Sequence, residues 1–342
     1  WDFISALYRK KHTVKGTEDQ RRVGGELSYD TGKGHYMNRL LQGAVGSCKT
    51  IVARMAMLLA ADNGFQSCMM VPTEILARQH FASISRMVEG LGVNVAVLTG
   101  STRKKERDTI LEELAYGRLH ILIGTHALIE ERVKFDNLGL VVIDEQHRFG
   151  VEQRARMWTK NSRPPHVLVM TATPIPRTLA MTLYGDLDVS VIDELPPGRK
   201  PIITRHLYDS QRMKLFGFMR REIARGRQVY VVYPLIKESE KMDYKDLYDG
   251  FETMSREFPL PDYRLSVVHG KLSPEEKDEG MRAFRDGETQ VMVATSVIEV
   301  GVDVPNATVM VIESAERVGL SQLHQLRGGV GRGGEQWAWV WV

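Results

Sequence analysis

The segment from Leu40 to Thr50, with the sequence LLQGAVGSCKT, contains the residue types that bind nucleoside triphosphates. Loops of the pattern GxxxxGK[ST] wrap the phosphates in backbone N–H groups, while their lysine reaches the outer phosphates and their hydroxyl holds magnesium. The apolar run at 51–61 predicts a helix whose positive N-terminal end faces the phosphates. We therefore expect nucleotide contacts from Gly43, Gly46, Ser47, Cys48, Lys49 and Thr50.

Cys48 stands where this pattern has glycine. Glycine is used there because it adopts positive φ and lets the backbone approach a ligand without a Cβ. If the loop holds the position in a left-handed conformation, the cysteine costs about 1–2 kcal/mol. We expect weakened nucleotide binding. The alternative interpretation is that this turn is only a tight connection before a helix.

The run LGLVVIDEQH at 138–147 predicts an apolar strand that ends on two carboxylates. The carboxyl ends of strands face the crevice where α/β sheets bind ligands. Asp144, together with Thr50, is expected to hold Mg²⁺, and Glu145 to orient or deprotonate the attacking water. Phosphoryl transfer needs mainly positioning and charge neutralisation, so Lys49, a metal and one carboxylate suffice on this side. An acidic helix N-cap is the alternative interpretation.

The composition is that of a globular protein with two domains, since 342 residues contain 43% hydrophobic and 26% charged residues. No apolar run has the length of a membrane span, and the N-terminus lacks a signal-peptide pattern, so we expect a cytoplasmic protein without membrane contact. A net charge of +3 is compatible with a polyanionic partner but does not argue for one. Cys48 and Cys68 are expected to be thiols.

Short β-rich runs alternate with helical patterns along the whole chain, which predicts parallel sheets with helices on both faces. We expect an α/β fold of two tandem RecA-like P-loop domains. The expected strands are Ser67–Val71, Val93–Leu98, His120–Gly124, Leu140–Ile143 and His166–Met170 in the first domain, and Gln228–Tyr233, Arg264–Val268, Gln290–Ala294, Thr308–Ile312 and Trp337–Val342 in the second.

The expected organisation is a lead segment at 1–36 without assigned structure, an ATP-binding domain at 37–193, a linker at 194–204 and a second domain at 205–342. The linker is predicted from the proline-rich sequence DELPPGRKP. The charged stretch 237–258 is interpreted as a surface insertion with a helix. Because the chain starts at Trp1 and ends on WAWVWV, we expect a truncated second domain in a fragment of a longer protein.

Taken in order, GAVGSCKT at 43–50, DEQH at 144–147, TATP at 171–174 and QLRGGVGR at 325–332 resemble the motif series of superfamily 2 helicases. The longer segments DEQHRFGV, TATPIPRTLA and GLSQLHQLRG are similar to those of the RecG family of branch-migration helicases. The Mfd family of translocases shares much of this, but its acidic box usually reads DEEQ. The resemblance covers about 17–336.

The resemblance implies two RecA-like lobes with ATP and Mg²⁺ bound between them. It places Gln20 on adenine and Asp303 on the nucleotide, and it makes Arg332 a catalytic residue. The residues implied to couple nucleotide and lobe motion are His147, Thr171, Thr173 and Gln325. Hydroxyl and glycine residues suit phosphate contacts that carry no sequence information. The residues implied to contact DNA are Pro72, Thr73, Gly100, Thr125, His126, His269, Gly270 and Thr295.

Two further positions depart from the family. Gly329 stands where its members have an arginine, and an arginine finger contributes about 10³–10⁵ in turnover. Arg332, the other arginine of that motif, is expected to recover part of this loss. Ala44 stands where aspartate is common. With Cys48, these residues predict impaired ATP hydrolysis.

The predicted function is an ATP-dependent DNA helicase or double-strand translocase core, monomeric, acting on branched or forked DNA in recombination and repair. One rival hypothesis is a DNA-binding module without ATP turnover, which Cys48 and Gly329 favour. The other is a P-loop NTPase that acts on a protein or small molecule, against which the motifs beyond residue 201 argue.

Overall fold

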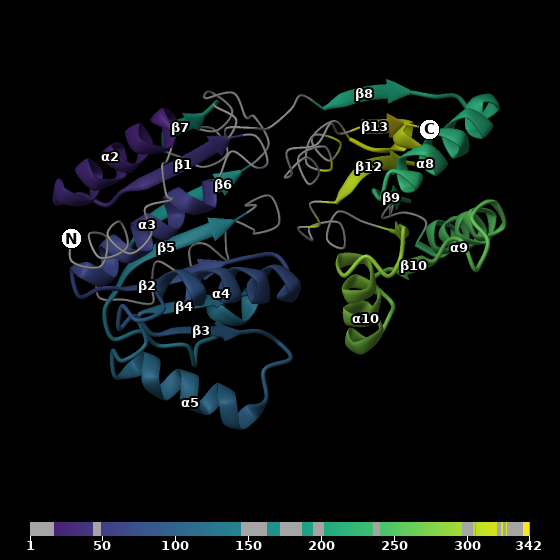
Figure 1. The fold of residues 1–342 in the computed structure, drawn as a ribbon. Coiled ribbons are helices and arrows are strands. Elements are labelled where there is room, and N and C mark those ends of the chain that lie inside the picture. Colours follow the sequence, from purple (N-terminus) through teal and green to yellow (C-terminus); the bar gives the residue numbers. More distant parts are fainter. Residues whose placement is uncertain are drawn as a thin grey trace. The chain divides into compact units, whose positions relative to one another are not determined.

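A computed structural model describes residues 17–43, 49–144, 163–171, 187–193, 202–234, 240–295, 306–319 and 338–341, together with 304, 323 and 326. The chain forms two compact units, Trp1–Glu194 and Leu195–Val342. Figure 1 shows that each unit is built on its own sheet with helices packed against it. The predicted boundaries of the lead segment and the linker stay predictions.

The first unit contains a seven-stranded sheet in the order β3-β4-β2-β5-β6-β1-β7, and every pairing between its described strands is parallel. Its strands are β1 Asn38–Gly43, β2 Gln66–Met70, β3 Val95–Leu98, β4 Ile121–Gly124, β5 Leu138–Asp144, β6 His166–Thr171 and β7 Asp188–Ile192. Its helices are α2 Glu18–Gly32, α3 Lys49–Asp62, α4 Glu74–Val88, α5 Lys104–Ala115 and the 3₁₀ turn η1 His126–Ile129. The predicted α/β class is confirmed.

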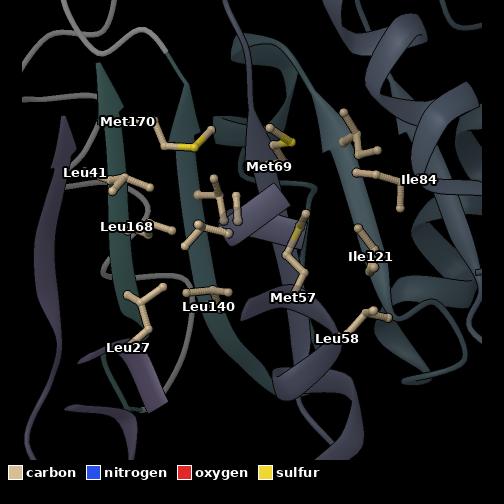
Figure 2. Close-up of a cluster of buried hydrophobic side chains, with 14 of the residues drawn as sticks. Leu27, Leu41, Met57, Leu58, Met69, Ile84, Ile121, Leu140, Leu168 and Met170 are labelled. Carbon is tan, nitrogen blue, oxygen red and sulfur yellow. The ribbon is translucent and has the colours of Figure 1, made fainter. Parts of the chain in front are cut away.

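Both faces of this sheet are covered, and neighbouring residues of one strand pack into opposite cores. Leu41 and Met69 lie in the core with α2, α3 and α4, whereas Leu40 and Met70 lie in the core with α5. This follows from the alternation of side chains along a strand, and it explains why the strands read as continuous apolar runs. Figure 2 shows the first of these cores, with Met57 of α3 among the strand side chains.

The helix α2 lies in the stretch that the sequence left unassigned. Its N-cap is Thr17, whose hydroxyl accepts from the backbone N–H of Gln20, while the Gln20 side chain accepts from the backbone N–H of Thr17. This reciprocal capping box satisfies two N–H groups that a helix start leaves without partners. Val23 and Leu27 of α2 are buried in the first core, so the helix is an integral part of this unit.

The second unit repeats the same strand order as β10-β11-β9-β12-β13-β8, with no counterpart of β7 among its described strands. Its described pairings are also parallel. Its strands are β8 Ile203–His206, β9 Gln228–Val232, β10 Leu265–Val268, β11 Val291–Ala294, β12 Ala307–Ile312 and β13 Ala338–Trp341. Its helices are η3 Asp209–Gln211, α8 Arg212–Ala224, α9 Glu240–Glu257, α10 Pro274–Arg285 and η4 Ala315–Arg317. The two sheets are thus built by the same winding of the chain.

The helix α9 confirms the helix predicted within 237–258 and corrects the interpretation of this stretch as a surface insertion. Leu247 and Met254 of this helix and the adjoining Phe258 are fully buried in a core beneath the second sheet. They recur at helical spacing among charged residues, so the helix is amphipathic and its apolar face is part of the domain. The high charge of the stretch belongs to its exposed face.

All ten predicted strands are confirmed, each within two residues of its expected bounds. The strands β1, β7 and β8 were not predicted from the sequence. β1 coincides with the start of the nucleotide loop, which hid its strand pattern. All four residues of β8 are exposed, so this strand lacks the apolar alternation that marks a half-buried strand.

The two units also share a buried glutamine at the start of equivalent strands. Gln66 begins β2, and its side-chain amide donates to the carbonyls of Leu114 and Leu119 at 2.9 and 2.8 Å. Gln228 begins β9 and donates to the carbonyls of Phe284 and Thr289 at 2.6 and 2.8 Å. Both glutamines therefore bind the turn that ends the helix before the neighbouring strand.

None of the helices in the described ranges combines the length and the apolar composition that crossing a bilayer demands.

Candidate functional site

Three predicted site residues meet at the carboxyl edge of the first sheet. The register pairs Gln42 with Thr171 and Met170 with Asp144, so β1, β6 and β5 end side by side. Gly43, the last residue of β1, and Asp144, the last residue of β5, are two strand spacings apart, or about 10 Å. Thr171 ends the strand between them. This edge is the place where a parallel α/β sheet binds ligands.

Lys49 is the first residue of α3 and is turned back towards the strand that precedes the loop. Its Nζ donates to the carbonyl oxygen of Gly43 at 2.7 Å, and the side chain is only 8% exposed. Thr50 follows as the second residue of the same helix, where backbone N–H groups point out of the helix end. The Lys49 ammonium therefore lies at the end of β1, and Thr50 follows it at the start of the helix.

Asp144 is mostly buried and lies next to a histidine that sequence reasoning missed. The Nε2 atom of His80 is 3.3 Å from Oδ2 of Asp144, and the two side chains are 12% and 15% exposed. His80 belongs to α4, whose buried face carries Ala77, Ile84 and Val88. A polar residue on this otherwise apolar stripe is the signal that would have found it.

The residues at this edge fit a magnesium ion. Mg²⁺ keeps several waters and takes one or two carboxylates together with substrate phosphates. Asp144 and Thr50 offer one carboxylate and one hydroxyl. Among the described residues no group of three or more His, Cys, Asp and Glu side chains is arranged to hold a metal by itself, so the described residues contain no closed all-protein site.

The second unit has an ion pair at the position that corresponds to this edge. Glu313 directly follows β12 as Asp144 ends β5, and it is buried. The guanidinium of Arg212, the first residue of α8, donates to both carboxylate oxygens at 2.8 and 2.9 Å. A fixed cation thus neutralises Glu313 where the first unit offers Lys49, Thr50 and Asp144.

Two segments predicted to contact DNA are bound to each other in the first unit. Glu74, the first residue of α4, accepts from the backbone N–H of Ser101 at 3.1 Å and from its hydroxyl at 2.6 Å. Thr73 caps the same helix by accepting from the N–H of Leu76. The segment at 72–74 and the segment at 99–101 therefore form one surface, although the Glu74–Ser101 pair is 27 residues apart in sequence.

The Glu74 carboxylate is stabilised in its charged form. Burial raises its pKa, but the hydrogen bonds from the Ser101 hydroxyl and N–H, with the positive charge of Arg78, outweigh burial and lower the pKa below its ordinary value. Arg107 donates to the carbonyl of Thr99 at 2.9 Å and pairs with Glu130 at 2.8 Å, which fixes the far side of the loop. This loop is therefore ordered by charged side chains on both sides.

Equivalent threonines follow β4 and β11. Thr125 and Thr295 are buried, and both hydroxyl oxygens lack a hydrogen-bond partner within the described part of the chain. An unpaired buried hydroxyl is costly and calls for an explanation. Of the other predicted contacts, Gly100, His126 and Gly270 are exposed, and Pro72 is half-buried.

His269 is buried rather than exposed. Its Nδ1 accepts from the backbone N–H of Lys271 at 3.3 Å, which leaves the proton on Nε2, 2.7 Å from the hydroxyl oxygen of Tyr248. Burial lowers the pKa of His269, and the charges of Lys277 and Lys271 lower it further. The lowered pKa favours the neutral imidazole, and Tyr248 of α9 holds it.

Gln20 is 8% exposed and takes part in the capping box of α2, so its side-chain oxygen already has a backbone partner. Its contact with adenine stays a prediction. The remaining predicted site residues lie outside the described residues: Gly46, Ser47, Cys48, Glu145, His147, Thr173, Asp303, Gln325 and Arg332. Ala44 and Gly329 lie outside them as well. The second cysteine, Cys68, is a buried thiol, as predicted.

Comparison with known proteins places both units among helicases. The family described as DEAD/DEAH box helicase matches residues 17–182, and the helicase conserved C-terminal domain matches 211–334. The ATP-dependent DNA helicase RecG of Synechocystis sp. is 53% identical over 320 residues, which are 94% of this chain and 38% of that protein. RecG of Bacillus subtilis is 51% identical over 320 residues, 94% of this chain and 47% of that protein.

Solved structures of helicases are also similar to this chain. A structure of RecG bound to a three-way DNA junction matches with a TM-score of 0.80 and 43% identity, over 99% of this chain and 44% of the RecG chain. Mss116p bound to single-stranded RNA and AMP-PNP matches with a TM-score of 0.73 at 18% identity, over 100% of this chain and 72% of the other, which shows the fold alone. The chain spans less than half the length of these RecG relatives.

The two helicase domains follow one another in the expected order, and about half of the residues are identical to those of RecG proteins. The sequence resemblance is thereby confirmed: the chain belongs to the superfamily 2 helicases, and its two-unit core resembles that of RecG.

Proposed function

We propose that the chain is the ATP-hydrolysing motor core of a RecG-type DNA helicase. The observation that carries this proposal is the carboxyl edge of the first sheet, where Gly43, Thr171 and Asp144 end neighbouring strands and Lys49 is held beside them. A triphosphate needs a backbone cradle, a cation and a carboxylate at one edge. The names of the relatives, which are ATP-dependent DNA helicases, support turnover rather than binding alone.

The described residues have separate roles in this site. When a nucleotide binds, Lys49 would exchange its bond with the Gly43 carbonyl for bonds to the outer phosphates. Thr50 and Asp144 supply oxygen ligands for Mg²⁺, which when bound neutralises charge on the phosphates. We further propose the sequence-derived roles of Glu145 as water-orienting base, Gln20 on adenine, Asp303 on the nucleotide and Arg332 as a catalytic residue.

We propose a DNA backbone surface on each unit. In the first unit it comprises Pro72, Thr73, Gly100, Thr125 and His126; in the second, His269, Gly270 and Thr295. Arg78, Arg103 and Lys104 lie beside the first surface in sequence and supply positive charge for phosphates. The unpaired hydroxyls of Thr125 and Thr295 support this assignment, because a bound phosphate would give each a partner once the segment opens.

The RecG relatives are more than twice as long as the part that this chain matches, so the DNA substrate is proposed from one of their structures. A RecG structure holds a three-way junction, so we propose branched or forked DNA as the partner. We also propose that the protein is monomeric and cytoplasmic and that coupling between nucleotide and DNA passes through His147, Thr171, Thr173 and Gln325.

The test is ATP hydrolysis by this chain with and without a forked duplex. We expect turnover that DNA stimulates and that Lys49→Ala abolishes. Lys134→Ala is the matched control, because Lys134 is an exposed lysine just before β5, at the opposite edge of the sheet. Salt-sensitive DNA binding without turnover in any variant would favour the DNA-binding module, and turnover without any DNA binding at low salt would favour an NTPase with another partner.

A second experiment addresses the departures from the family. Restoring Cys48→Gly and Gly329→Arg together should raise DNA-stimulated turnover by at least about tenfold, because an arginine finger contributes about 10³–10⁵ and Arg332 is expected to replace only part of it. The single variants show how much each position contributes. Unchanged turnover in the double variant would contradict the expectation that these residues impair the motor.

A further inference from the structure

We propose that helix α4 couples the DNA surface of the first unit to its nucleotide site, with His80 as the positioning residue. The inference rests on the proposed function and adds to it a route between the two sites. Its basis is that the two ends of this route are fixed to the same helix: Glu74 at the first turn binds Ser101, and His80 approaches Asp144.

The first step is the attachment of the DNA surface to the helix. The Ser101 N–H and hydroxyl, which are donors of the kind that bind phosphates, are both used by the Glu74 carboxylate. A phosphate that takes these donors competes with Glu74 and repels its charge. DNA binding at 99–101 therefore releases or shifts the N-terminus of α4, where Thr73 is the cap.

The second step is transmission along the helix. Thr73 and His80 are seven residues apart, which places them on nearly the same face and about 10 Å apart along the axis. Ala77 and Ile84 on either side of His80 are fully buried, so this part of α4 moves with its packing as one rigid element. A shift at the first turn is thus carried to His80.

The third step is the contact with Asp144. His80 Nε2 lies 3.3 Å from Asp144 Oδ2 in a largely buried setting, so the histidine restricts how the carboxylate is oriented. Displacing His80 frees Asp144 to face the nucleotide side of the edge. DNA and nucleotide then favour the same arrangement of α4, which gives positive coupling between the two ligands.

The test is the affinity of a fluorescent ADP analogue with and without a saturating forked duplex, measured with Mg²⁺ and again with EDTA. We expect DNA to raise nucleotide affinity at least about fivefold in the unaltered chain, a typical coupling factor. His80→Leu places an apolar side chain on the buried face of α4 and removes the contact with Asp144, so the coupling factor of this variant should fall to about one. His80→Gln places an N–H near the position of Nε2 and should retain coupling.

His35→Ala is the control, because it removes a histidine from an exposed turn, and thermal unfolding checks that each variant is folded. Glu74→Ala should also reduce the coupling factor, and the variant with both Glu74→Ala and His80→Leu should lose no more than either alone, since both break one route. Additive losses would contradict a shared route.

The two proposals fail in different ways. Full coupling in a folded His80→Leu variant would overturn this inference and leave the proposed function intact. Absence of nucleotide or DNA binding by the unaltered chain would overturn both. Loss of coupling in His80→Gln to the same extent as in His80→Leu would show a packing effect instead of a polar contact with Asp144.

Discussion

Replacing Gln66 with methionine should destabilise the first unit specifically. The glutamine is 3% exposed, its amide donates to the carbonyls of Leu114 and Leu119, and its oxygen accepts from the backbone N–H of Asn137 at 2.9 Å. Methionine has a similar length and preserves the apolar contacts, so the change removes polar contacts and little else. The Leu119 carbonyl and the Asn137 N–H lose their partner, whereas the Leu114 carbonyl keeps its bond from the Gly117 N–H at 3.2 Å.

The magnitude follows from these three contacts. At about 1 kcal/mol of net free energy for each hydrogen bond, the loss is about 3 kcal/mol, and the desolvation of the orphaned backbone groups raises it to about 5 kcal/mol. For a unit of this size, that corresponds to a fall in its unfolding temperature of roughly 10 °C. Gln228→Met should cost less, about 2–3 kcal/mol, because its third contact, from the Asn306 amide, is long at 3.3 Å, and that amide also donates to Gly226 at 2.8 Å.

The assay is urea unfolding followed by hydrogen exchange of peptides from β2 and β9. Each variant is the control of the other, because the same substitution is made at equivalent positions of the two units. Gln66→Met should speed exchange in β2 and spare β9, and Gln228→Met should do the reverse. A loss below about 1 kcal/mol in both variants would refute the importance of these glutamines, and equal loosening of both strands by either variant would refute the independence of the two units.

Two further predictions concern single substitutions. Gly250→Ala should destabilise the second unit by about 1–3 kcal/mol, because the added Cβ would lie 2.0 Å from the hydroxyl of Tyr233. Gly217→Ala in α8 is the control: its Cβ would meet only the flexible Arg221 side chain at 3.8 Å, so the same urea titration should show a stabilisation of about 0.5–1 kcal/mol. Folding lowers the pKa of Glu74, so its bond with Ser101 stabilises the protein above the ordinary glutamate pKa, and this stabilisation is lost as pH falls through the lowered pKa. The difference in unfolding free energy between the unaltered chain and Glu74→Gln should therefore shrink between pH 7 and pH 3. A difference that stays constant over this range would contradict the prediction.

The ten predicted strands were predictable because parallel strands buried on both faces are continuous apolar runs, a local property of the sequence. The sequence match to the GxxxxGK[ST] pattern has a related reason: such a loop is one short segment, so the residues from Gly43 to Thr50 carry the pattern together, and their contact with a nucleotide stays a prediction. The acidic end of β5 followed from the same reasoning, because a strand and the residue that ends it are consecutive.

The misses have physical reasons as well. The charge of α9 was read as a sign of a surface insertion because average composition does not show on which face Leu247 and Met254 lie. The four side chains of the edge strand β8 are exposed, so its assignment depends on pairing with β13. In both cases the deciding contact is with a distant part of the chain.

The sequence by itself determined the fold class and the family, because both follow from patterns among residues that are close along the chain. Only the tertiary structure decided that Glu74 binds Ser101 and that His80 approaches Asp144. These pairs join segments that are far apart in sequence, and their distance depends on the register and packing of the whole sheet. Helical spacing shows that His80 is on the buried face of α4, but only the folded unit shows which carboxylate lies opposite.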